Sequence, residues 1–325
     1  MKAIVQDSYG PAGVLDLRDI DRPAIGDEEV LVRVRAAGVD PGVWILMAGR
    51  PYLVRLAAGL RRPRVAVRGR DLAGVVAAVG ARVTRFRPGD EVYGTCLGGS
   101  YAEFAGTPEQ RLARKPANLT FAQAAAAPVS GMTALRAVRD TGAVRPGHRV
   151  MVIGASGGVG SQAAQIAKAY GATVTGVCAP DRIDFVRSLG VDDVLDYTRE
   201  EVDRDGPVYD VIVDTGGDRA LSLLRRALTP HGTLALVGGA YAKGPLLGGY
   251  GRQIFRAPLL SLFVGQRLRT VSAVERTEDL DELRELVESG ALTPAVDRAY
   301  PLAQAADAIR HVAGGHPAGK IVVTI

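Results

Sequence analysis

A glycine-rich turn between a buried strand and a helix is the feature that most constrains how this chain folds. Segment Val150–Gly160 reads VMVIGASGGVG and overlaps a continuous apolar strand, Arg149–Ile153. A helical pattern, Val159–Tyr170, follows the turn, and a second apolar strand, Thr173–Val177, comes next. Strand, glycine turn, helix and strand in this order, within about 30 residues, predict a βαβ unit in a parallel sheet.

The turn also offers what a phosphate-bearing ligand needs. Glycines let the backbone approach a pyrophosphate, and the start of a helix presents unpaired N–H groups and a positive dipole end. The strict G-x-G-x-x-G spacing fails, because Ser156 stands where a second glycine would follow Gly154. The order of elements still predicts that Gly154, Ser156, Gly157, Gly158 and Val159 bind a dinucleotide, with a merely structural tight turn as the alternative.

The tip of the second strand indicates which dinucleotide is bound. An NAD site places an acid about 20 residues after the first glycine, where it would repel a 2′-phosphate. Residues 174–178 read VTGVC, ending at Cys178, and contain no acid. We expect Asp181 to cap the helix Asp181–Leu189, while Arg182 can pair with a phosphate. This favours NADPH over NADH; an ordinary surface role for Arg182 is the alternative.

Further apolar runs continue the alternation of strands and helices, at Val208–Val213, Thr233–Val237 and Thr270–Val274. Such alternation predicts an α/β fold, a doubly wound parallel sheet of the Rossmann kind. Ligands of open parallel sheets bind at the carboxyl ends of the strands. The candidates that we place at such ends are Thr215, Val237, Gly238, Phe263 and Val264.

The first 120 residues follow a different pattern, of short valine-rich runs between turns. Val30–Ala36 alternates as VLVRVRA, Gly74–Val79 reads GVVAAV, and a Pro-Gly-Asp turn precedes Glu91–Tyr93. These patterns predict a small β-rich domain. The last segment, Pro317–Ile325, is strand-like and follows a helix at Leu302–His311, so it could return to that domain.

Composition limits the possible functions. All four histidines (148, 231, 311, 316) follow position 147, and the first 147 residues hold one cysteine, Cys96; we therefore expect no zinc. No stretch reaches the roughly 18 apolar residues of a membrane span. The amino-terminal MKAIVQDSYG is unlike a secretion signal, and two cysteines fit a reducing compartment, so we expect a cytoplasmic protein.

Charge is concentrated in one stretch. Between Pro41 and Arg70 the chain has seven arginines and no carboxylate, within a net charge of +5. A solvated loop is one interpretation, and a rim that attracts an anionic substrate or cofactor phosphate is the other. Nucleic acid is not expected as a partner, because no base-stacking aromatics are interleaved with these arginines.

Seven short motifs, spread over the whole chain, point to a known family. They are Ala37–Pro41, Gly69–Gly74, Arg87–Gly94, Gly99–Glu103, Ser130–Ala134, Gly154–Gly160 and Gly319–Val323. With them the chain resembles, from end to end, a zinc-independent medium-chain dehydrogenase/reductase of the quinone oxidoreductase (zeta-crystallin) group. The resemblance implies a GroES-like substrate domain at 1–122 and 295–325, a Rossmann domain at 123–294, NADPH in the cleft and a homodimer.

The resemblance also implies roles for single residues. It places Thr133 and the turn at 156–159 against the nicotinamide and pyrophosphate, and Val264 near the carboxamide. Arg182 and Tyr197 fall where the family holds the adenosine 2′-phosphate. Lys320, in the last motif, is taken as a further cofactor contact.

The catalytic candidates from the resemblance are Asp40 and Tyr52. Relatives often carry Asn-Pro-x-Asp where this chain has Asp40, Pro41, Gly42 and Val43, which weakens any relay built on those side chains. Tyr52 falls roughly where related enoyl reductases keep a tyrosine proposed to donate a proton. A tyrosine that only lines the pocket is the alternative.

We therefore expect a reductase that transfers hydride from NADPH to a quinone or another conjugated carbonyl. Without a metal to polarise the substrate oxygen, an acceptor already activated by conjugation is favoured. An enoyl thioester or enone reductase is the second hypothesis, and an NADPH-binding protein with little catalysis is the third. The expected partners are a small-molecule substrate and a second copy of the chain, with no membrane.

Overall fold

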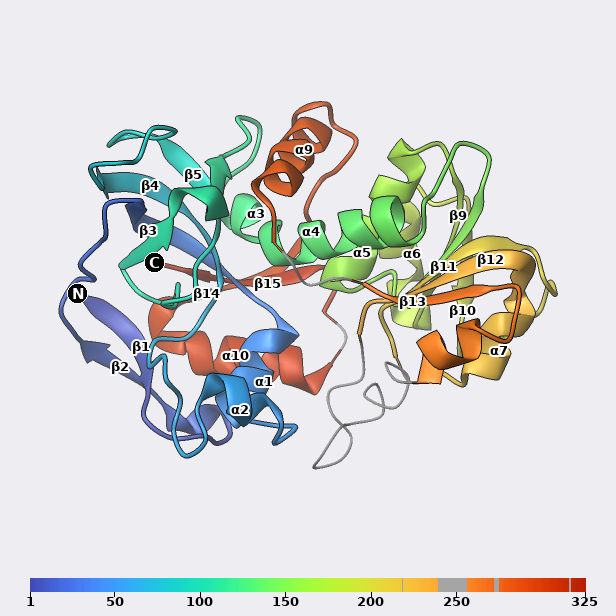
Figure 1. The fold of residues 1–325 in the computed structure, drawn as a ribbon, viewed down its shortest axis with the longest axis horizontal. Coiled ribbons are helices and arrows are strands. Elements are labelled where there is room, and N and C mark those ends of the chain that lie inside the picture. The colour runs from blue at the N-terminus through green and yellow to red at the C-terminus, as the bar shows by residue number, and fades with distance from the viewer. Residues whose placement is uncertain (218, 239–255, 272–274, 316) are drawn as a thin grey trace. The chain divides into compact units, whose positions relative to one another are not determined.

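The computed structural model describes residues 1–217, 219–238, 256–271, 275–315 and 317–325. The chain divides into two compact units (Figure 1). The first unit comprises Met1–Met132, Glu275–Ser289 and Pro294–Ile325. The second comprises Thr133–Val274 and Gly290–Thr293.

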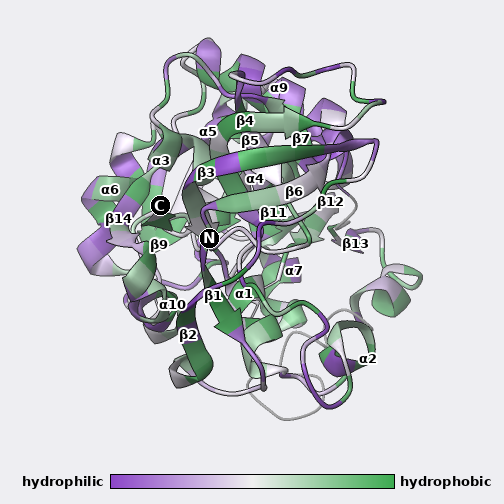
Figure 2. Cartoon of the chain, turned by 90° about the vertical axis from the view of Figure 1, so that its left-hand side faces the viewer, coloured by the Kyte–Doolittle hydropathy of each residue, from purple (hydrophilic) through white to green (hydrophobic). Residues whose placement is uncertain are grey.

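A seven-stranded sheet in the order β14-β15-β3-β4-β5-β7, with β6 also paired to β3, builds the first unit. Alternation of apolar and polar residues makes β3 a half-buried strand, and hydrophobic residues run along β3 and β4 (Figure 2). The strands are β3 (Glu29–Val39), β4 (Asp71–Val79), β5 (Glu91–Thr95), β6 (Phe104–Pro108), β7 (Leu112–Arg114), β14 (Val296–Pro301) and β15 (Lys320–Thr324). A separate pair, β1 (Lys2–Gln6) with β2 (Leu15–Asp19), is antiparallel.

The last strand completes the sheet that the first residues begin. β15 pairs with β3 in antiparallel register, with Ile321 opposite Val39, and on its other side with β14 in parallel register. The helices of this unit are η1 (Ala12–Val14), α1 (Pro41–Ala48), α2 (Val54–Ala58), η2 (Glu109–Arg111), α3 (Phe121–Ala125), α9 (Thr277–Glu288), η5 (Leu302–Gln304) and α10 (Ala305–Gly314). Helix α4 (Pro128–Arg136) crosses from the first unit into the second.

The second unit is an all-parallel sheet of six strands in the order β10-β9-β8-β11-β12-β13. This is the Rossmann order, which reverses next to β8 and so puts helices on both faces. The strands are β8 (Arg149–Ile153), β9 (Thr173–Cys178), β10 (Asp193–Asp196), β11 (Tyr209–Asp214), β12 (Leu228–Leu236) and β13 (Arg267–Thr270). The helical segments are η3 (Ala137–Thr141), α5 (Gly158–Ala169), η4 (Pro180–Arg182), α6 (Ile183–Ser188) and α7 (Leu221–Ala227).

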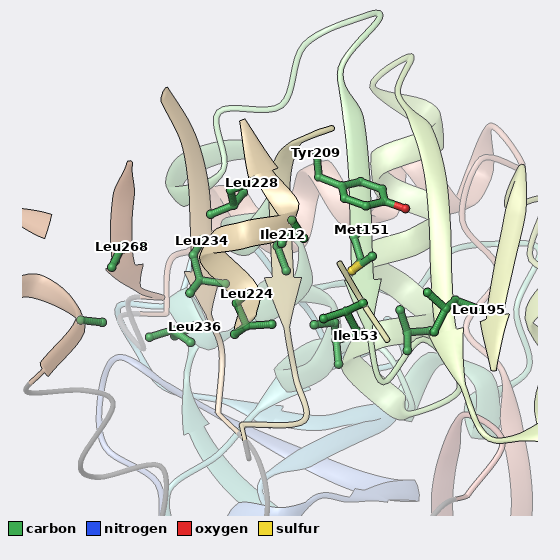
Figure 3. Packing of buried hydrophobic residues seen from close by; sticks show 14 residues of the cluster. Met151, Ile153, Leu195, Tyr209, Ile212, Leu224, Leu228, Leu234, Leu236 and Leu268 are labelled. Atoms are coloured by element: carbon green, nitrogen blue, oxygen red, sulfur yellow. The ribbon is translucent and has the colours of Figure 1, made fainter. Parts of the chain in front are cut away.

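Fully buried aliphatic side chains hold the second unit together. Met151 and Ile153 from β8 meet Ile212 from β11 and Leu234 from β12 in one cluster, to which Leu224 adds from α7 (Figure 3). Strands β8, β9 and β11 are buried on both faces, which explains why they read as continuous apolar runs.

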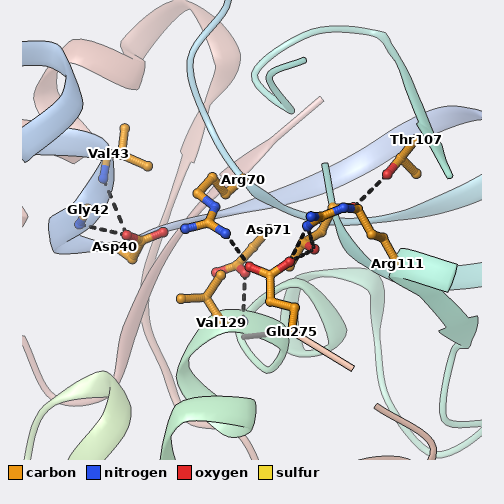
Figure 4. A network of polar contacts seen from close by, with 10 residues as sticks. Asp40, Gly42, Val43, Arg70, Asp71, Thr107, Arg111, Val129 and Glu275 are labelled. Carbon is orange, nitrogen blue, oxygen red and sulfur yellow. Dashed lines mark hydrogen bonds and ion pairs between the residues drawn. The ribbon is translucent and has the colours of Figure 1, made fainter. Parts of the chain in front are cut away.

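The structure assigns α9 to the first unit, whereas the sequence boundaries at 122/123 and 294/295 leave it in the Rossmann domain. Contacts to β5 and η2 explain the assignment. The Tyr93 hydroxyl donates to the Leu280 carbonyl at 2.6 Å, and Glu275 pairs with both Arg70 and Arg111 (Figure 4). Within the described residues no helix is long and apolar enough to cross a bilayer.

Candidate cofactor-binding site

Backbone hydrogen bonds and a positive φ make the turn after β8 tight. The Gly154 and Ala155 amides both donate to the Val177 carbonyl at 3.0 Å, and the Gly157 amide donates to the Gly154 carbonyl at 3.0 Å. Gly154 has φ of +77°, a conformation that glycine adopts without strain. The sharp turn therefore delivers the chain directly into α5.

The start of α5 is open on the side of this loop. Gly157 is the N-cap and no side chain caps the helix, so its first amides are free of side-chain partners. A Cβ at Gly160 would lie 2.1 Å from the Gly154 carbonyl oxygen, so only glycine fits there. Ser156 is 8% exposed and Val159 half-buried. This donor set fits a pyrophosphate, because the helix N-terminus supplies both N–H groups and positive potential.

The tip of β9 carries no carboxylate. Cys178 is 2% exposed, and burial raises the pKa of its thiol to about 11, so it stays neutral. Arg182 lies just beyond, with its guanidinium 3.4 Å from the Asp181 carboxylate. The prediction that Asp181 caps a helix is wrong: the chain enters through the 3₁₀ turn η4, whose N-cap is Ala179 with no side-chain hydrogen bond.

Tyr197 follows β10, whose last residue, Asp196, is in register with Cys178. The Tyr197 amide donates to the Cys178 carbonyl at 3.4 Å, so the two strand ends adjoin. Arg219 places its guanidinium 5.7 Å from the centre of the Tyr197 ring. Sequence reasoning missed Arg219, although it stands just after a glycine turn at the carboxyl end of β11, which was a usable signal.

Two neighbouring strand ends complete this edge of the sheet. The Thr215 hydroxyl donates to the Ile153 carbonyl at 2.7 Å, which ties the end of β11 to the glycine turn. The Val237 amide donates to the Asp214 carbonyl at 3.0 Å, and Gly238 follows. The edge therefore holds the turn at 154–160 and the ends of β9, β10, β11 and β12.

Phe263 and Val264 do not belong to this edge. They precede β13, which begins at Arg267, so the expectation that they follow the carboxyl end of a strand is wrong. Part of the expected strand Thr270–Val274 lies outside the described residues. Gly265 lies beside Pro230 near the start of β12, and Phe263 is 79% exposed. Thr133 is half-buried on α4.

In the first unit, Asp40 is the N-cap of α1. Its Oδ1 accepts from the Gly42 amide at 2.7 Å and the Val43 amide at 3.3 Å (Figure 4). Its Oδ2 is buried and has no hydrogen-bond partner among the described residues. Tyr52 is 44% exposed, with the Arg50 and Arg55 guanidiniums 5.7 Å and 4.9 Å from its ring centre.

Lys320 is 3% exposed and paired inside the first unit. Its Nζ lies 2.9 Å from Asp71 Oδ2 and 3.1 Å from Ser130 Oγ. Burial raises the pKa of Asp71, and the ammonium of Lys320 opposes that rise. The ammonium is therefore engaged by a carboxylate, and a cofactor contact from Lys320 stays a prediction.

No cluster of three or more His, Cys, Asp or Glu side chains that could hold a metal occurs in the described ranges. The described histidines also lie apart in the topology: His148 precedes β8, His231 is in β12 and His311 is in α10.

The chain matches two family models: "Alcohol dehydrogenase GroES-like domain" over residues 26–117 and "Zinc-binding dehydrogenase" over residues 189–323. The mouse (Mus musculus) mitochondrial NAD(P)H oxidoreductase RTN4IP1 is 32% identical, over 100% of this chain and 89% of that protein. The Arabidopsis thaliana chloroplastic NADPH-dependent alkenal/one oxidoreductase is 33% identical, over 99% of this chain and 79% of that protein. The quinone oxidoreductase of Coxiella burnetii superposes with a TM-score of 0.85 at 28% identity, covering 100% and 99% of the two chains.

These similarities agree with the folds of the two units. The chain belongs to the quinone oxidoreductase group of the medium-chain dehydrogenase/reductase family. It is accordingly an oxidoreductase, and it uses a nicotinamide cofactor.

Proposed function

We propose that the enzyme transfers a hydride from NADPH to a quinone or another conjugated carbonyl, without zinc. The observation that carries the proposal is the strand edge of the second unit, where α5 begins with no side-chain cap and β9 ends in Cys178, not in a carboxylate. When bound, the cofactor supplies the hydride. The protein binds the pyrophosphate at 154–160 and orients the nicotinamide through Thr133.

Preference for NADPH follows from charge at the tip of β9. Cys178 stands where an NAD site needs a carboxylate, and its neutral thiol does not repel a 2′-phosphate. Arg182 supplies a cation just beyond Cys178, and Arg219 places another beside the ring of Tyr197, the side chain that we assign to the adenosine end. A charged hydrogen bond to phosphate contributes about 1.5–3 kcal/mol.

The scarcity of histidine and cysteine in the first part of the chain supports zinc independence. A catalytic zinc needs about three nitrogen, sulfur or carboxylate ligands, and the first 147 residues have no histidine and a single cysteine. That cysteine, Cys96, is fully buried, and burial raises the pKa of its thiol to about 12. Substrates that need no Lewis acid, such as quinones, suit this site.

The test is NADPH oxidation by the purified enzyme with an ortho-quinone and with an enoyl thioester, side by side, with NADH as the cofactor control. Fast turnover with the quinone and a strong preference for NADPH support the proposal. Stoichiometric zinc by elemental analysis would overturn zinc independence. Equal use of NADH would overturn the preference for NADPH.

Arg182→Glu tests the cofactor site within the same assay. We expect KM for NADPH to rise more than tenfold while KM for NADH stays within about twofold, because only NADPH carries the 2′-phosphate. Arg145→Glu is the matched control, since Arg145 is exposed and precedes β8, at the end of that strand away from the glycine turn.

An enoyl thioester or enone reductase is the second candidate, favoured by the exposure of Tyr52. Its hydroxyl is accessible to an acceptor that requires a proton as well as a hydride. Preference for the thioester, together with a large drop in kcat for Tyr52→Phe, would establish it. Tight NADPH binding with no oxidation by any acceptor would instead favour a binding protein with little catalysis.

We also propose a homodimer in the cytoplasm. Two buried, unpaired thiols, Cys96 and Cys178, suit a reducing compartment. Light scattering of the purified chain tests the dimer.

A further inference from the structure

Exposed apolar side chains gather in one short stretch of the first unit. Among the described residues, eleven large hydrophobic side chains are exposed, and five of these lie within residues 52–65. Leu56 on α2 is 66% exposed and Leu60, just after it, is 67% exposed. The five are Tyr52, Leu53, Leu56, Leu60 and Val65. Single exposed leucines are ordinary, but such a concentration on a protein surface marks a contact site.

The same stretch carries exposed positive charge, of which Arg62 interacts electrostatically with Asp7 outside the stretch. Arg61, Arg62 and Arg64 are exposed, and in the described part of the first unit none of them forms an ion pair. The Arg64 guanidinium only donates to the Ala57 carbonyl, at 3.3 Å. With no carboxylate anywhere from Pro41 to Arg70, these guanidiniums produce a local positive field.

The stretch is also held in shape. The Arg55 guanidinium lies 4.5 Å from the centre of the Tyr9 ring, and the Tyr9 hydroxyl donates to the Gly59 carbonyl at 2.6 Å. The Arg64 amide donates to the Ala58 carbonyl at 2.8 Å, which folds the following loop back on α2. The leucines and arginines are therefore held in place before binding, so the segment loses little conformational entropy when it binds.

We propose that the segment Tyr52–Val65 docks the enzyme on an anionic lipid surface. The leucines would enter the boundary between headgroups and acyl chains, while Arg61, Arg62 and Arg64 contact lipid phosphates. Lipid is favoured over an acidic protein by size. A stable protein interface uses about 20–30 residues a side, whereas this segment has fourteen.

The proposal departs from the expectation of no membrane partner. That expectation rested on the lack of a spanning stretch, and a peripheral contact needs none. The exposure of Leu56 and Leu60 is a property of the folded chain that the sequence does not display. The proposal is independent of which acceptor the enzyme reduces.

Co-sedimentation of the full chain with vesicles tests the proposal directly. The probes are vesicles of phosphatidylglycerol and phosphatidylcholine, with phosphatidylcholine alone as the neutral comparison. We expect binding to the anionic vesicles only. Leu56→Asp/Leu60→Asp and Arg61→Glu/Arg62→Glu/Arg64→Glu should each weaken it at least tenfold, since each arginine near such a surface is worth roughly fivefold.

Matched controls separate position from total charge and hydropathy. Arg145→Glu/Arg267→Glu/Arg269→Glu makes the same charge change at exposed sites of the second unit, and Leu17→Asp removes a leucine that is 42% exposed on β2. Both should bind like the native chain. Far-ultraviolet circular dichroism and the melting temperature of every variant check that it is folded.

Three results would overturn the proposal. The first is no binding of the native chain to anionic vesicles. The second is an equal loss in the control arginine triple, which would indicate net charge alone. The third is full binding by the folded leucine variant. That result would show that the arginines adsorb the protein to the vesicle surface and that the leucines do not insert.

Discussion

Asp71 and Lys320 form a buried ion pair, so that the ammonium of Lys320 is engaged by a carboxylate. Asp71 is fully buried, and its Oδ1 also accepts from the Val129 amide at 2.8 Å. A buried carboxylate is tolerated there because a cation and a backbone amide offset the cost of removing it from water. Its position beside the last strand was not readable from the sequence, because residues 71 and 320 meet only in the fold.

Lys320→Met should therefore destabilise the protein, and more so at high pH. Burial already raises the pKa of Asp71, and loss of the ammonium raises it further. The folded state then holds a proton that the unfolded chain releases, so stability falls as pH rises above the usual carboxyl range. We expect a loss of about 3–5 kcal/mol near pH 8.

Urea unfolding at about pH 5 and pH 8 measures this difference. Lys2→Met is the control, since the Lys2–Asp19 pair is exposed and surface pairs contribute about 0–1 kcal/mol. An equal loss for Lys320→Met at both pH values would contradict the assignment.

Among the elements, helix α1 depends on its N-cap, Asp40. Asp40→Ala removes the cap and should cost about 1 kcal/mol of unfolding free energy, whereas Asp40→Asn keeps an acceptor for the Gly42 and Val43 amides. Thermal unfolding compares the two. If Asp40→Asn keeps native stability but loses kcat, the carboxylate acts in the chemistry; unchanged kcat would leave Asp40 a cap only.

The glycine turn permits a second test at this scale. Gly160→Ala should abolish NADPH binding, measured by fluorescence titration, because the new Cβ collides with the Gly154 carbonyl. Gly314→Ala, with open space around its Cβ, is the control and should bind normally. Binding by the Gly160 variant within a few fold of native would show that the turn does not hold the pyrophosphate.

The elements of secondary structure differ in how well the sequence predicted them. The strands of the second unit were predicted within a few residues at Arg149–Ile153, Thr173–Val177 and Val208–Val213, because apolar runs between glycines have no other stable place than a buried sheet. The placement of Phe263 and Val264 failed, because an apolar run does not show where a strand begins, and both residues precede β13, which starts at Arg267. The sequence did not predict the ion pair of Lys320 or the exposure of Leu56, because both depend on contacts between residues that are distant in sequence.

At the scale of the whole molecule, the first unit depends on one strand that lies between two others. β15 pairs on both sides, with β14 and β3. Deleting residues 320–325 should unfold most of the first unit while the second, with its own core, stays folded. Limited proteolysis should then cut the first unit and leave a fragment of the second; Thr324→Ala is the intact-chain control. A native digestion pattern for the truncated chain would refute this dependence.

The place of β15 also has a consequence for biosynthesis. A ribosome delivers the strands of the second unit before the chain end, so the nucleotide-binding sheet can assemble while the sheet that began at the amino terminus still waits for its final strand. Amino-terminal domains usually fold first during translation. Here the order is reversed: the half that is made first must remain open until β15 has left the exit tunnel, and it is the half that newborn chains would need chaperones to shield.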